Sequence, residues 1–439
     1  MTSSSPAAAA RSAVVVTASE PEPRSFGKQV VLGGLLDHLC ARLGPDRVHV
    51  LLVGRPDVPR PATPYRLEVV PRPRAREQLL AGATRVVPPP HSSLQEAALW
   101  SPRVLRQLRE ALARVDADLE VWDTMRTGQY ARRLPRRRRV LYADDLFSER
   151  YATMLRRIRA DSSRLDNPLG EFAKVLPGVA GRLAAHQAVH VPLLRLERRL
   201  TARSEAAAPG HFDATVLVNA AEAEELTRRS GDPHVRTLLP LLREPRAAER
   251  HHDGTATFVF LGGLDFPPNR DGLRWFLGTC RESVLAQVPD FRLLVVGRGS
   301  EQLPEEAAAW GDRVQPLGWV DDLDAVLAGA AGLLSPLRIG SGIKIKVLEA
   351  LSRGLPVVAT PHGVLGLDVG PDDGCLVGDG PAALAALLAR ARTTGENARL
   401  SSAARAAWRR RFAPDVAARA YDEVLGLPSV DADRPGTPR

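Results

Sequence analysis

The stretch that most constrains the fold of this chain lies at residues 335–363 and reads SPLRIGSGIKIKVLEALSRGLPVVATPHG. Its order of apolar segment, glycine loop, helical segment and second apolar segment predicts a buried strand, a loop, a helix over 343–353 and another buried strand. Gly340 and Gly342 would let a ligand approach the backbone closely. A helix that begins near Ile343 would point unpaired N–H groups and the positive end of its dipole at that ligand.

Two of the chain's few lysines lie in this turn. Of 60 basic residues the only lysines are Lys28, Lys174, Lys344 and Lys346. Compact ammonium groups suit phosphate, and Glu349 follows Lys346 by three residues, which puts both on one helix face. Cations for a diphosphate beside a carboxylate for sugar hydroxyls predict a nucleotide site. Lys344 could equally be a solvated surface lysine, and Glu349 an exposed helix acid.

Length and composition bound the class of protein. The 439 residues suggest two domains, and the 44% hydrophobic content is that of a globular protein. Cys40, Cys280 and Cys375 are widely spaced and match no metal-ligand pattern, so we expect reduced, mostly buried thiols. No apolar run reaches the roughly 18 residues of a membrane span. The beginning of the chain has no basic segment before an apolar core, which predicts a disordered leader over 1–12 rather than a signal peptide.

The positive charge leaves several partners open. The net charge is +9, and the one concentrated basic run is RRLPRRRRV at 132–140. This run could be a solvated turn before a strand, a patch for an anionic membrane surface or acceptor, or a nucleic-acid arm. Because arginine is enriched along the whole chain, we expect no nucleic-acid partner. We expect a cytoplasmic protein that attaches weakly, through this run, to the inner face of the cell membrane.

The first half alternates apolar runs with amphipathic stretches, which is typical of a parallel α/β protein. Strands are expected at 13–18, 47–53, 119–123, 139–145 and 213–219. A helix over 28–43 follows the first strand. Residues 55–95 are rich in proline and arginine and are expected to be irregular, and 147–207 are expected to form a helical insertion. These elements predict one Rossmann-like domain over 13–242.

A polar linker over 243–256 precedes a second set of elements. His251 and His252 lie in it without a third ligand nearby and do not predict a metal site. Strands are expected at 257–262, 291–297, 313–320, 331–337, 355–360 and 375–378. Helices are expected at 270–288, 321–329, 343–353, 381–393, 396–412 and 414–426. The predicted fold class is α/β, with two Rossmann-like domains facing across a ligand cleft. The second domain covers 257–412, a C-terminal helix over 413–427 packs back towards the first, and 428–439 form a disordered tail.

Three segments between 257 and 370 carry a resemblance to a known family. They read FVFLGGLDFPPNRDGLRWF, then FRLLVVGRGS, then VQPLGWVDDLDAVLAGAAGLLSPLRIGSGIKIKVLEALSRGLPVVATPHGVLGL. They closely resemble the donor-binding domain of glycosyltransferase family 4, which has the GT-B fold. In the first half, RSFGKQ, LYADDLFSERYATM and RLERRL followed by FDATVLVNAAEAEEL are similar to segments of bacterial members. The resemblance implies a retaining glycosyltransferase of the EC 2.4 class, with the acceptor bound by the first domain.

The resemblance also implies roles for single residues. Glu349 matches the second acid of the family's E-x7-E pattern and would hold the ribose, whereas the first acid falls on Ser341, a departure at the position that would contact the donor sugar. Lys344 and Lys346 would bind the diphosphate and would act in catalysis together with Asp145. Asp145 and its neighbour Asp144 could instead cap the helix that follows them. The other residues expected to contact the nucleotide sugar are Gly27, Gly263, Arg270, Gly297, Arg338, Gly340, Gly342, Ile343 and Val347.

The implied reaction moves a sugar from a nucleoside-diphosphate sugar to a hydroxyl of a glycan or lipid-linked acceptor, in cell-envelope or polysaccharide synthesis. Negative charge develops on the leaving diphosphate, and lysines, loop amides and a helix N-terminus would stabilise it. We therefore expect neither a metal nor a cofactor. The alternatives are a GT-B nucleotide-sugar epimerase and a catalytically inactive GT-B binding protein. A dinucleotide-dependent oxidoreductase is disfavoured, because SFGKQVVLGG lacks the G-x-G-x-x-G pattern.

Overall fold

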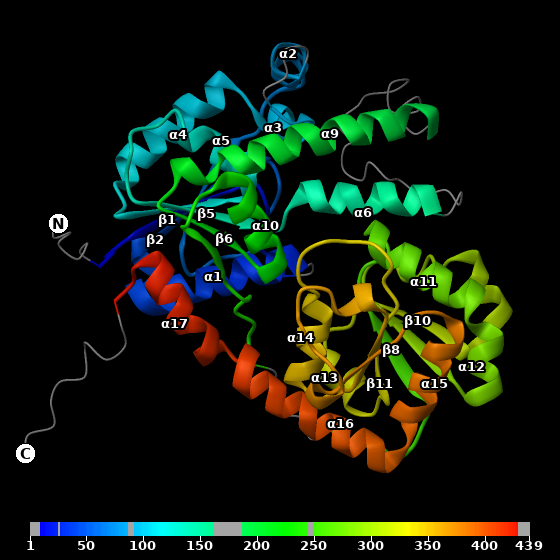
Figure 1. Cartoon of the computed structure of the whole chain (residues 1–439). Coiled ribbons are helices and arrows are strands. Elements are labelled where there is room, and N and C mark those ends of the chain that lie inside the picture. The colour runs from blue at the N-terminus through cyan, green and yellow to red at the C-terminus, as the bar shows by residue number, and fades with distance from the viewer. Residues whose placement is uncertain (1–8, 25–26, 87–91, 161–186, 245–249, 429–439) are drawn as a thin grey trace, which may run out of the picture. The chain divides into compact units, whose positions relative to one another are not determined.

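The computed structural model describes residues 9–24, 27–86, 92–160, 187–244 and 250–428. The chain divides into two compact units, each built on one sheet (Figure 1). Unit 1 comprises residues 1–146, 199–241 and 414–439, and unit 2 comprises 147–198 and 242–413. The helical segment 147–198, which the sequence analysis assigned to the first domain, groups with unit 2.

Unit 1 holds a seven-stranded parallel sheet in the order β3-β2-β1-β4-β5-β6-β7. Its strands are β1 (Ala13–Thr17), β2 (Val48–Gly54), β3 (Arg66–Pro71), β4 (Leu119–Asp123), β5 (Arg139–Asp144), β6 (Ala214–Leu217) and β7 (Val235–Thr237). The order of the strands reverses between β1 and β4. Ligands of open parallel sheets bind at the carboxyl ends of the strands beside such a reversal.

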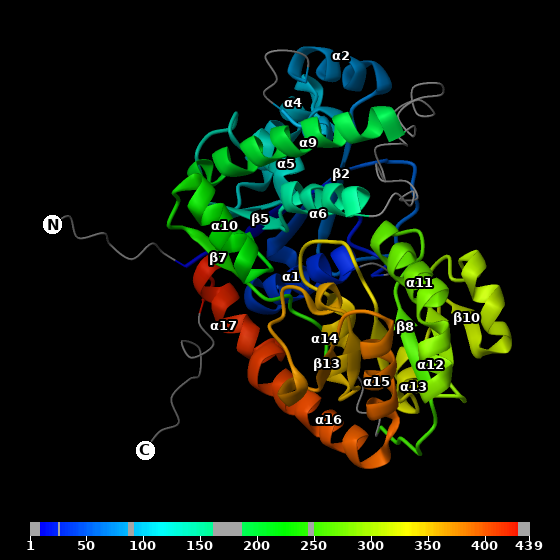
Figure 2. The same ribbon diagram turned by 45° about the vertical axis from the view of Figure 1, so that its right-hand side comes forward.

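Helices cover both faces of this sheet (Figures 1 and 2). They are α1 (Gly27–Leu43), α2 (Ala75–Arg85), α3 (Leu94–Leu99), α4 (Pro102–Val115), α5 (Thr124–Ala131), α10 (Ala220–Ser230) and α17 (Pro414–Leu425). The short 3-10 helices η1 (Pro45–Arg47) and η2 (Pro209–His211) lie in loops. Figures 1 and 2 show α4 and α5 on one face and α1 and α17 on the other.

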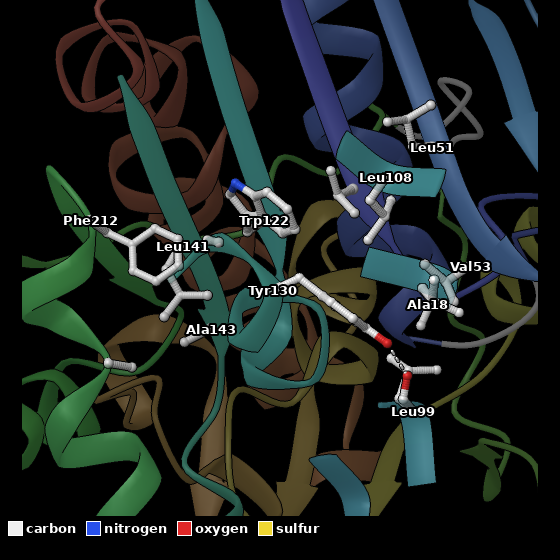
Figure 3. Close-up of a cluster of buried hydrophobic side chains, with 14 of the residues drawn as sticks. Ala18, Leu51, Val53, Leu99, Leu108, Trp122, Tyr130, Leu141, Ala143 and Phe212 are labelled. Atoms are coloured by element: carbon white, nitrogen blue, oxygen red, sulfur yellow. Dashed lines mark hydrogen bonds between the residues drawn. The ribbon is translucent and has the colours of Figure 1, made fainter. Parts of the chain in front are cut away.

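The core on the α4–α5 face is built by alternate residues of the strands (Figure 3). Trp122 of β4 and Leu141 of β5 point to this face and are fully buried with Tyr130 of α5. The Tyr130 hydroxyl donates a hydrogen bond to the Leu99 carbonyl, so its polar end is satisfied inside the core. Burial of each such side chain contributes about 1.5–3 kcal/mol, which fixes the register of strands whose ends carry the polar residues described below.

Unit 2 holds a six-stranded parallel sheet in the order β10-β9-β8-β11-β12-β13, which reverses between β8 and β11. Its strands are β8 (Thr257–Leu261), β9 (Arg292–Val296), β10 (Val314–Gly318), β11 (Gly332–Ser335), β12 (Val357–Ala359) and β13 (Cys375–Val377). Its helices are α11 (Pro267–Thr279), α12 (Arg281–Gln287), α13 (Leu323–Ala328), α14 (Ile345–Ser352), α15 (Pro381–Arg392) and α16 (Thr394–Ala407), with α6 (Phe147–Ala160) and the first part of α9 (Gln187–Ala207). Shorter helical turns are η3 (Glu305–Arg313), η4 (Pro361–Val364), η5 (Pro371–Asp373) and the π-helical η6 (Trp408–Phe412).

An aromatic cluster forms the centre of unit 2. Phe276, Phe291 and Trp310 pack with ring centroids 5.5–6.0 Å apart, and Phe291 also stacks on Phe258 of β8. The Trp310 indole N–H donates to the Leu277 carbonyl over 2.8 Å, which satisfies its polar atom in the core. The cluster anchors α11 against the sheet and thereby positions the loop between β8 and α11.

Two predictions about these elements were wrong. Residues 55–95 are not irregular throughout, because they contain β3, α2 and the beginning of α3. β3 is an edge strand with exposed positions, and therefore lacks the continuous apolar run that marks most of the predicted strands. The single helix expected over 270–288 is two helices that meet at Cys280, which caps α11 and precedes α12.

The C-terminal helix α17 packs on unit 1. The hydroxyls of Tyr421 and Tyr142 lie 2.8 Å apart in the core. Asp422 accepts a hydrogen bond from Arg42 of α1 over 2.6 Å and contacts His38 over 2.8 Å. The three cysteines are unpaired thiols, as expected. Among the described helices none has the length and apolar content needed to cross a membrane.

Candidate functional site

The loops at the carboxyl ends of β8 and β9 approach each other as closely as their backbones permit. Gly297 has a φ of +135°, and a Cβ at this position would lie 2.6 Å from the carbonyl carbon of Gly262. Only glycine fits there, for steric and conformational reasons together. The Gly297 amide donates to the Gly318 carbonyl over 2.8 Å, which ties the loop after β9 to the end of β10. Gly263 follows Gly262 in the chain and also lacks a side chain, so backbone groups line this edge of the sheet.

Lys346 lies at the strand reversal, in the first turn of α14. Its Nζ donates to the side-chain oxygen of Asn269 over 2.7 Å and lies 4.6 Å from the centre of the Phe260 ring. Burial, followed by the nearby charge of Lys344, lowers the pKa of Lys346 to about 7. In the described part of the chain Lys346 forms no ion pair with a carboxylate. Its positive charge is therefore suited to an anionic ligand.

Lys344 contacts the backbone of its own glycine loop. It is the N-cap residue of α14, which begins at Ile345 rather than near Ile343. Its side chain is not solvated: Lys344 is only 7% exposed, and Nζ donates to the carbonyls of Ser341, over 2.9 Å, and Gly342, over 3.2 Å. Gly340 and Gly342 have φ values of +123° and +65°. The Lys344 side chain thus hydrogen-bonds to the glycine loop that precedes it, and its ammonium group lies against the backbone of that loop.

Glu349 lies one turn beyond Lys346 and carries an ion pair within its own helix. Its carboxylate contacts the guanidinium of Arg353, whose Nε contacts Asp324 over 2.6 Å. The Glu349 side chain is 24% exposed, so part of the carboxylate can still accept hydrogen bonds from a ligand. Arg353 fixes its direction.

The other predicted residues of unit 2 are distributed along the same edge. Arg270 donates from Nε to the Leu264 carbonyl over 3.0 Å, so its side chain braces the β8–α11 loop. Arg338 lies over the Trp275 ring at 5.0 Å. Ser341 accepts a hydrogen bond from Arg150 over 3.1 Å. Ile343 is partly exposed, whereas Val347 is fully buried and can act only by packing.

Unit 1 has a charged cluster at its own strand reversal. Asp123 ends β4, is 1% exposed, accepts from Thr17 Oγ1 over 2.7 Å and contacts Lys28 Nζ over 2.5 Å. Lys28 also contacts Asp144, the last residue of β5, over 3.3 Å. Asp144 has a φ of +74° and Thr124 one of +68°, conformations that cost about 1–3 kcal/mol each for residues with a side chain.

The charges of this cluster balance only in part. Burial raises the pKa of Asp144, and the attraction of Lys28 opposes that shift without cancelling it. Burial alone would lower the pKa of Lys28, but Asp123 and Asp144 outweigh it and leave the pKa raised. Two carboxylates against one ammonium make this edge acidic, whereas the edge of unit 2 is basic.

Two further expectations concern unit 1. Gly27 is the first residue of α1, directly before Lys28, and Asp145 is only 6% exposed beside Asp144. The basic run at 132–140 is less exposed than expected, because Arg139 is buried, at 3% exposure, and donates to the Ala131 carbonyl. The run also precedes β5 and so lies at the amino edge of the sheet, opposite the charged cluster.

Sequence reasoning missed Asn269 and Asp123. Each has a signal that could have found it: Asp123 is the last residue of a buried strand, and Asn269 follows a proline pair at the beginning of a helix. In the described residues no group of three or more histidine, cysteine, aspartate or glutamate side chains is arranged to hold a metal ion.

Comparison with known proteins gives matches of two kinds. Residues 255–393 match the family model described as Glycosyl transferases group 1. Over 112 residues the chain is 30% identical to the "Uncharacterized 44.6 kDa protein in cps region" of Klebsiella pneumoniae, which covers 24% of this chain and 29% of that protein. Over 107 residues it is 35% identical to phosphatidyl-myo-inositol mannosyltransferase of Mycolicibacterium smegmatis, covering 24% of this chain and 27% of that protein. The match thus spans less than a third of either relative.

Solved structures match nearly the whole chain at low identity. Sucrose-phosphate synthase from Thermosynechococcus elongatus superposes with a TM-score of 0.63 at 17% identity, over 94% of this chain and 98% of that one. WaaG, a glycosyltransferase involved in lipopolysaccharide biosynthesis, gives 0.59 at 16% identity, over 94% and 100%. HepE of Anabaena in complex with UDP gives 0.59 at 14%, over 94% and 99%. The chain therefore has the GT-B fold, and the match to the glycosyl transferases group 1 model lies within unit 2.

Proposed function

We propose that this protein is a retaining glycosyltransferase of family 4, which moves a hexosyl group from a nucleoside-diphosphate sugar to an acceptor hydroxyl. The observation that carries the proposal is the edge of unit 2. There, Lys346 has no carboxylate partner among the described residues, and Glu349 lies one helical turn farther on. The backbones of Gly262 and Gly297 are in close contact at the same edge. A cationic, backbone-lined site beside a carboxylate matches a diphosphate joined to a ribose.

The chemistry follows from where the charges lie. As the bond from the sugar to the diphosphate breaks, negative charge grows on the phosphate oxygens. Lys346 and the amides of the 340–344 loop would stabilise that charge without rearrangement, and Lys344 beneath the loop adds to the positive potential. With this charge supplied by the chain, the reaction needs no metal ion. We propose front-face retention, in which the departing phosphate takes the proton of the acceptor hydroxyl.

The names of similar proteins agree with this proposal in substrate class. One relative is a mannosyltransferase, and HepE has been solved with UDP and with UDP-glucose. WaaG acts in lipopolysaccharide biosynthesis, and the Klebsiella relative comes from a cps region. We propose a role in cell-envelope or polysaccharide synthesis with a glycan or lipid-linked acceptor.

We propose that the acceptor binds to unit 1, at the edge that holds the Lys28–Asp123–Asp144 cluster. An acidic edge repels the phosphates of the donor and can accept hydrogen bonds from the hydroxyls of a sugar. Asp145, beside this cluster, would contact the acceptor hydroxyl during transfer. If Asp145 has this role, Asp145→Asn lowers kcat while binding of the nucleotide is unchanged; equal loss of both would contradict it.

One observation favours a second candidate. Ser341 stands where the family has an acid, and it is engaged by Arg150, as in a protein that binds nucleotide sugars without turning them over. An epimerase would instead need acidic and histidine groups that converge on the sugar. Release of free nucleotide in the presence of acceptor separates the transferase from both alternatives.

We propose a cytoplasmic enzyme with weak, salt-reversible attachment to anionic membrane. The exposed arginines of the basic run supply part of the charge. On α2, Leu79 and Leu80 are 67% and 65% exposed, and Arg74 and Arg76 are exposed beside them. Flotation with anionic vesicles at low salt should fall when both leucines become glutamine, and should also fall at high salt. No flotation of the wild type would remove the membrane role.

The test of the function itself is nucleotide release by the purified chain from UDP-, GDP- and ADP-sugars. Lys346→Ala should reduce kcat by a factor that corresponds to about 2–4 kcal/mol of lost transition-state stabilisation. Wild-type kinetics in this variant would reject the site.

A further inference from the structure

Asn269 holds Lys346 in place with an uncharged group. It is 7% exposed in the first turn of α11. Its amide nitrogen donates to the Gly263 carbonyl over 2.9 Å, and its amide oxygen accepts from Lys346 Nζ over 2.7 Å. Since a carbonyl can only accept, the nitrogen end of the amide must face Gly263, which leaves the oxygen end for the lysine. Asn269 therefore joins the β8–α11 loop to α14 across the strand reversal.

The space for this amide depends on Gly262. A Cβ at Gly262 would lie 2.5 Å from the Asn269 amide nitrogen and 3.0 Å from Lys346 Nζ. The glycine, the amide and the lysine thus form one close-packed unit. This geometry fixes the direction of the ammonium group more tightly than a solvated lysine would allow.

Lys28, another lysine of the described residues, has opposite surroundings. Lys28 in unit 1 contacts two carboxylates, Asp123 and Asp144, which neutralise its charge. Around Lys346, α14 contributes the cation Lys344, β8 the phenyl ring of Phe260, and α11 the amide of Asn269.

Two acids on the elements beside Lys346, Glu349 and Asp265, form no ion pair with it. Glu349 is on the same helix as Lys346 and contacts Arg353, and Asp265 is exposed in the β8–α11 loop. Arg270, next to Asn269, adds a further cation that is bonded to the Leu264 carbonyl. Lys346 is therefore surrounded by other cations, an aromatic ring and an amide, and pairs with no carboxylate of the described residues.

From this contrast we propose that Asn269 is a positioning residue, which holds Lys346 through an uncharged hydrogen-bond acceptor. The diphosphate then supplies the negative partner that the protein does not, and Lys346 takes up a proton when the ligand binds. The inference rests on the proposed function, and it names how the charge of that site is controlled. The proton comes from solvent and goes to Lys346 Nζ. No other bond changes.

The pH dependence follows in sign. The pKa of free Lys346 is about 7, lowered by burial and then by Lys344. A bound diphosphate favours the ammonium form and raises that pKa. Between the two pKa values the complex holds one proton more than the free protein, so affinity falls as pH rises, by up to about tenfold per unit. Well below pH 7 the free lysine is already charged, and affinity should be nearly constant there.

The decisive variant is Asn269→Asp, which keeps the shape and adds one negative charge. The carboxylate would pair with Lys346, raise its pKa and cancel its charge. We expect affinity for UDP-glucose or GDP-mannose at pH 7 to fall on the order of 10- to 100-fold. The loss of affinity between pH 7 and 8 should also disappear. Gln287→Glu, an exposed position at the end of α12, makes the same change of charge and should leave binding unchanged.

Calorimetry in two buffers of different ionisation enthalpy measures the proton directly. For the wild type at pH 8 we expect uptake approaching one proton per nucleotide sugar, and for Asn269→Asp uptake near zero. Asn269→Ala should weaken binding but keep a pH-dependent proton uptake. This variant no longer holds the Lys346 ammonium group in place, but it adds no negative charge beside it. A merely structural role would lower the thermal midpoint in both variants without moving the pH profile.

The outcomes separate the inference from the function on which it rests. If UDP-glucose or GDP-mannose binds to the wild type without proton uptake at pH 8, or binds equally to Asn269→Asp, the inference is wrong and the proposed function stands. If neither binds to the folded wild type, the proposed function fails and the inference fails with it.

Discussion

Replacement of Glu349 by glutamine tests whether its carboxylate only stabilises α14 or also binds the nucleotide. The structure gives Glu349 one visible role, an ion pair with Arg353 four residues later in α14. The proposed function gives it a second role, as the acceptor of hydrogen bonds from the ribose hydroxyls. Glutamine has the same shape, so the change removes charge without making a cavity.

The two roles predict effects of different size. The ion pair is partly exposed, at 17% for Arg353 and 24% for Glu349, and such helix pairs contribute about 0.3–0.5 kcal/mol to stability. Arg353 also keeps Asp324 as a partner at 2.6 Å. Hydrogen bonds from a ribose to a carboxylate contribute about 1.5–3 kcal/mol, roughly a 10- to 150-fold loss of nucleotide affinity.

The assay is titration calorimetry with UDP and GDP beside urea unfolding, on Glu349→Gln and on the control Asp324→Asn. The control removes the other acidic partner of Arg353 and leaves the predicted ribose contact. We expect weak binding and near-normal stability for Glu349→Gln, and normal binding for Asp324→Asn. Equal affinity in both variants would refute the ribose assignment.

Three further predictions concern the two charged edges. Lys344→Ala should lower the free energy of unfolding by about 1–3 kcal/mol in urea, because the carbonyls of Ser341 and Gly342 lose their donor; unchanged stability would show that the loop holds itself. Asp144→Asn should raise the thermal midpoint at pH 7 and change it little near pH 4, since a raised carboxyl pKa means a cost present above that pKa and relieved as pH falls; a lower midpoint at pH 7 would contradict this. Activity should be unchanged in EDTA, and loss that added Mg²⁺ or Mn²⁺ restores would show that the charge account is incomplete.

The sequence predicted most strands of both sheets because buried parallel strands are continuously apolar. β3 was missed because it is an edge strand whose exposed positions break that pattern. Its neighbour α2 was missed for a related reason: Leu79 and Leu80, its large apolar residues, are exposed rather than on a buried face. Amphipathic periodicity cannot identify a helix whose apolar side chains face solvent.

Within the candidate site the sequence pointed to the glycine loop and its lysines but could not predict what each side chain contacts. Lys344 and Lys346 are separated by one residue, yet one binds carbonyls of its own loop and the other binds an amide 77 positions earlier. The pair of Lys28 and Asp123 arises only when β1 and β4 become neighbours in the sheet. Such contacts depend on the order of the strands, which local sequence patterns do not specify.

The central claim is that the basic edge of unit 2 binds a nucleoside-diphosphate sugar for transfer. The most direct measurement is equilibrium binding of intact UDP-, GDP- and ADP-sugars to the folded wild type and to Lys346→Ala, with free nucleotide measured after addition of a glycan or lipid-linked acceptor. We predict that at least one sugar nucleotide binds and is consumed by the wild type, and that Lys346→Ala loses most of the turnover. Binding of none of them by a protein that unfolds cooperatively, or equal turnover in both proteins, would contradict the account.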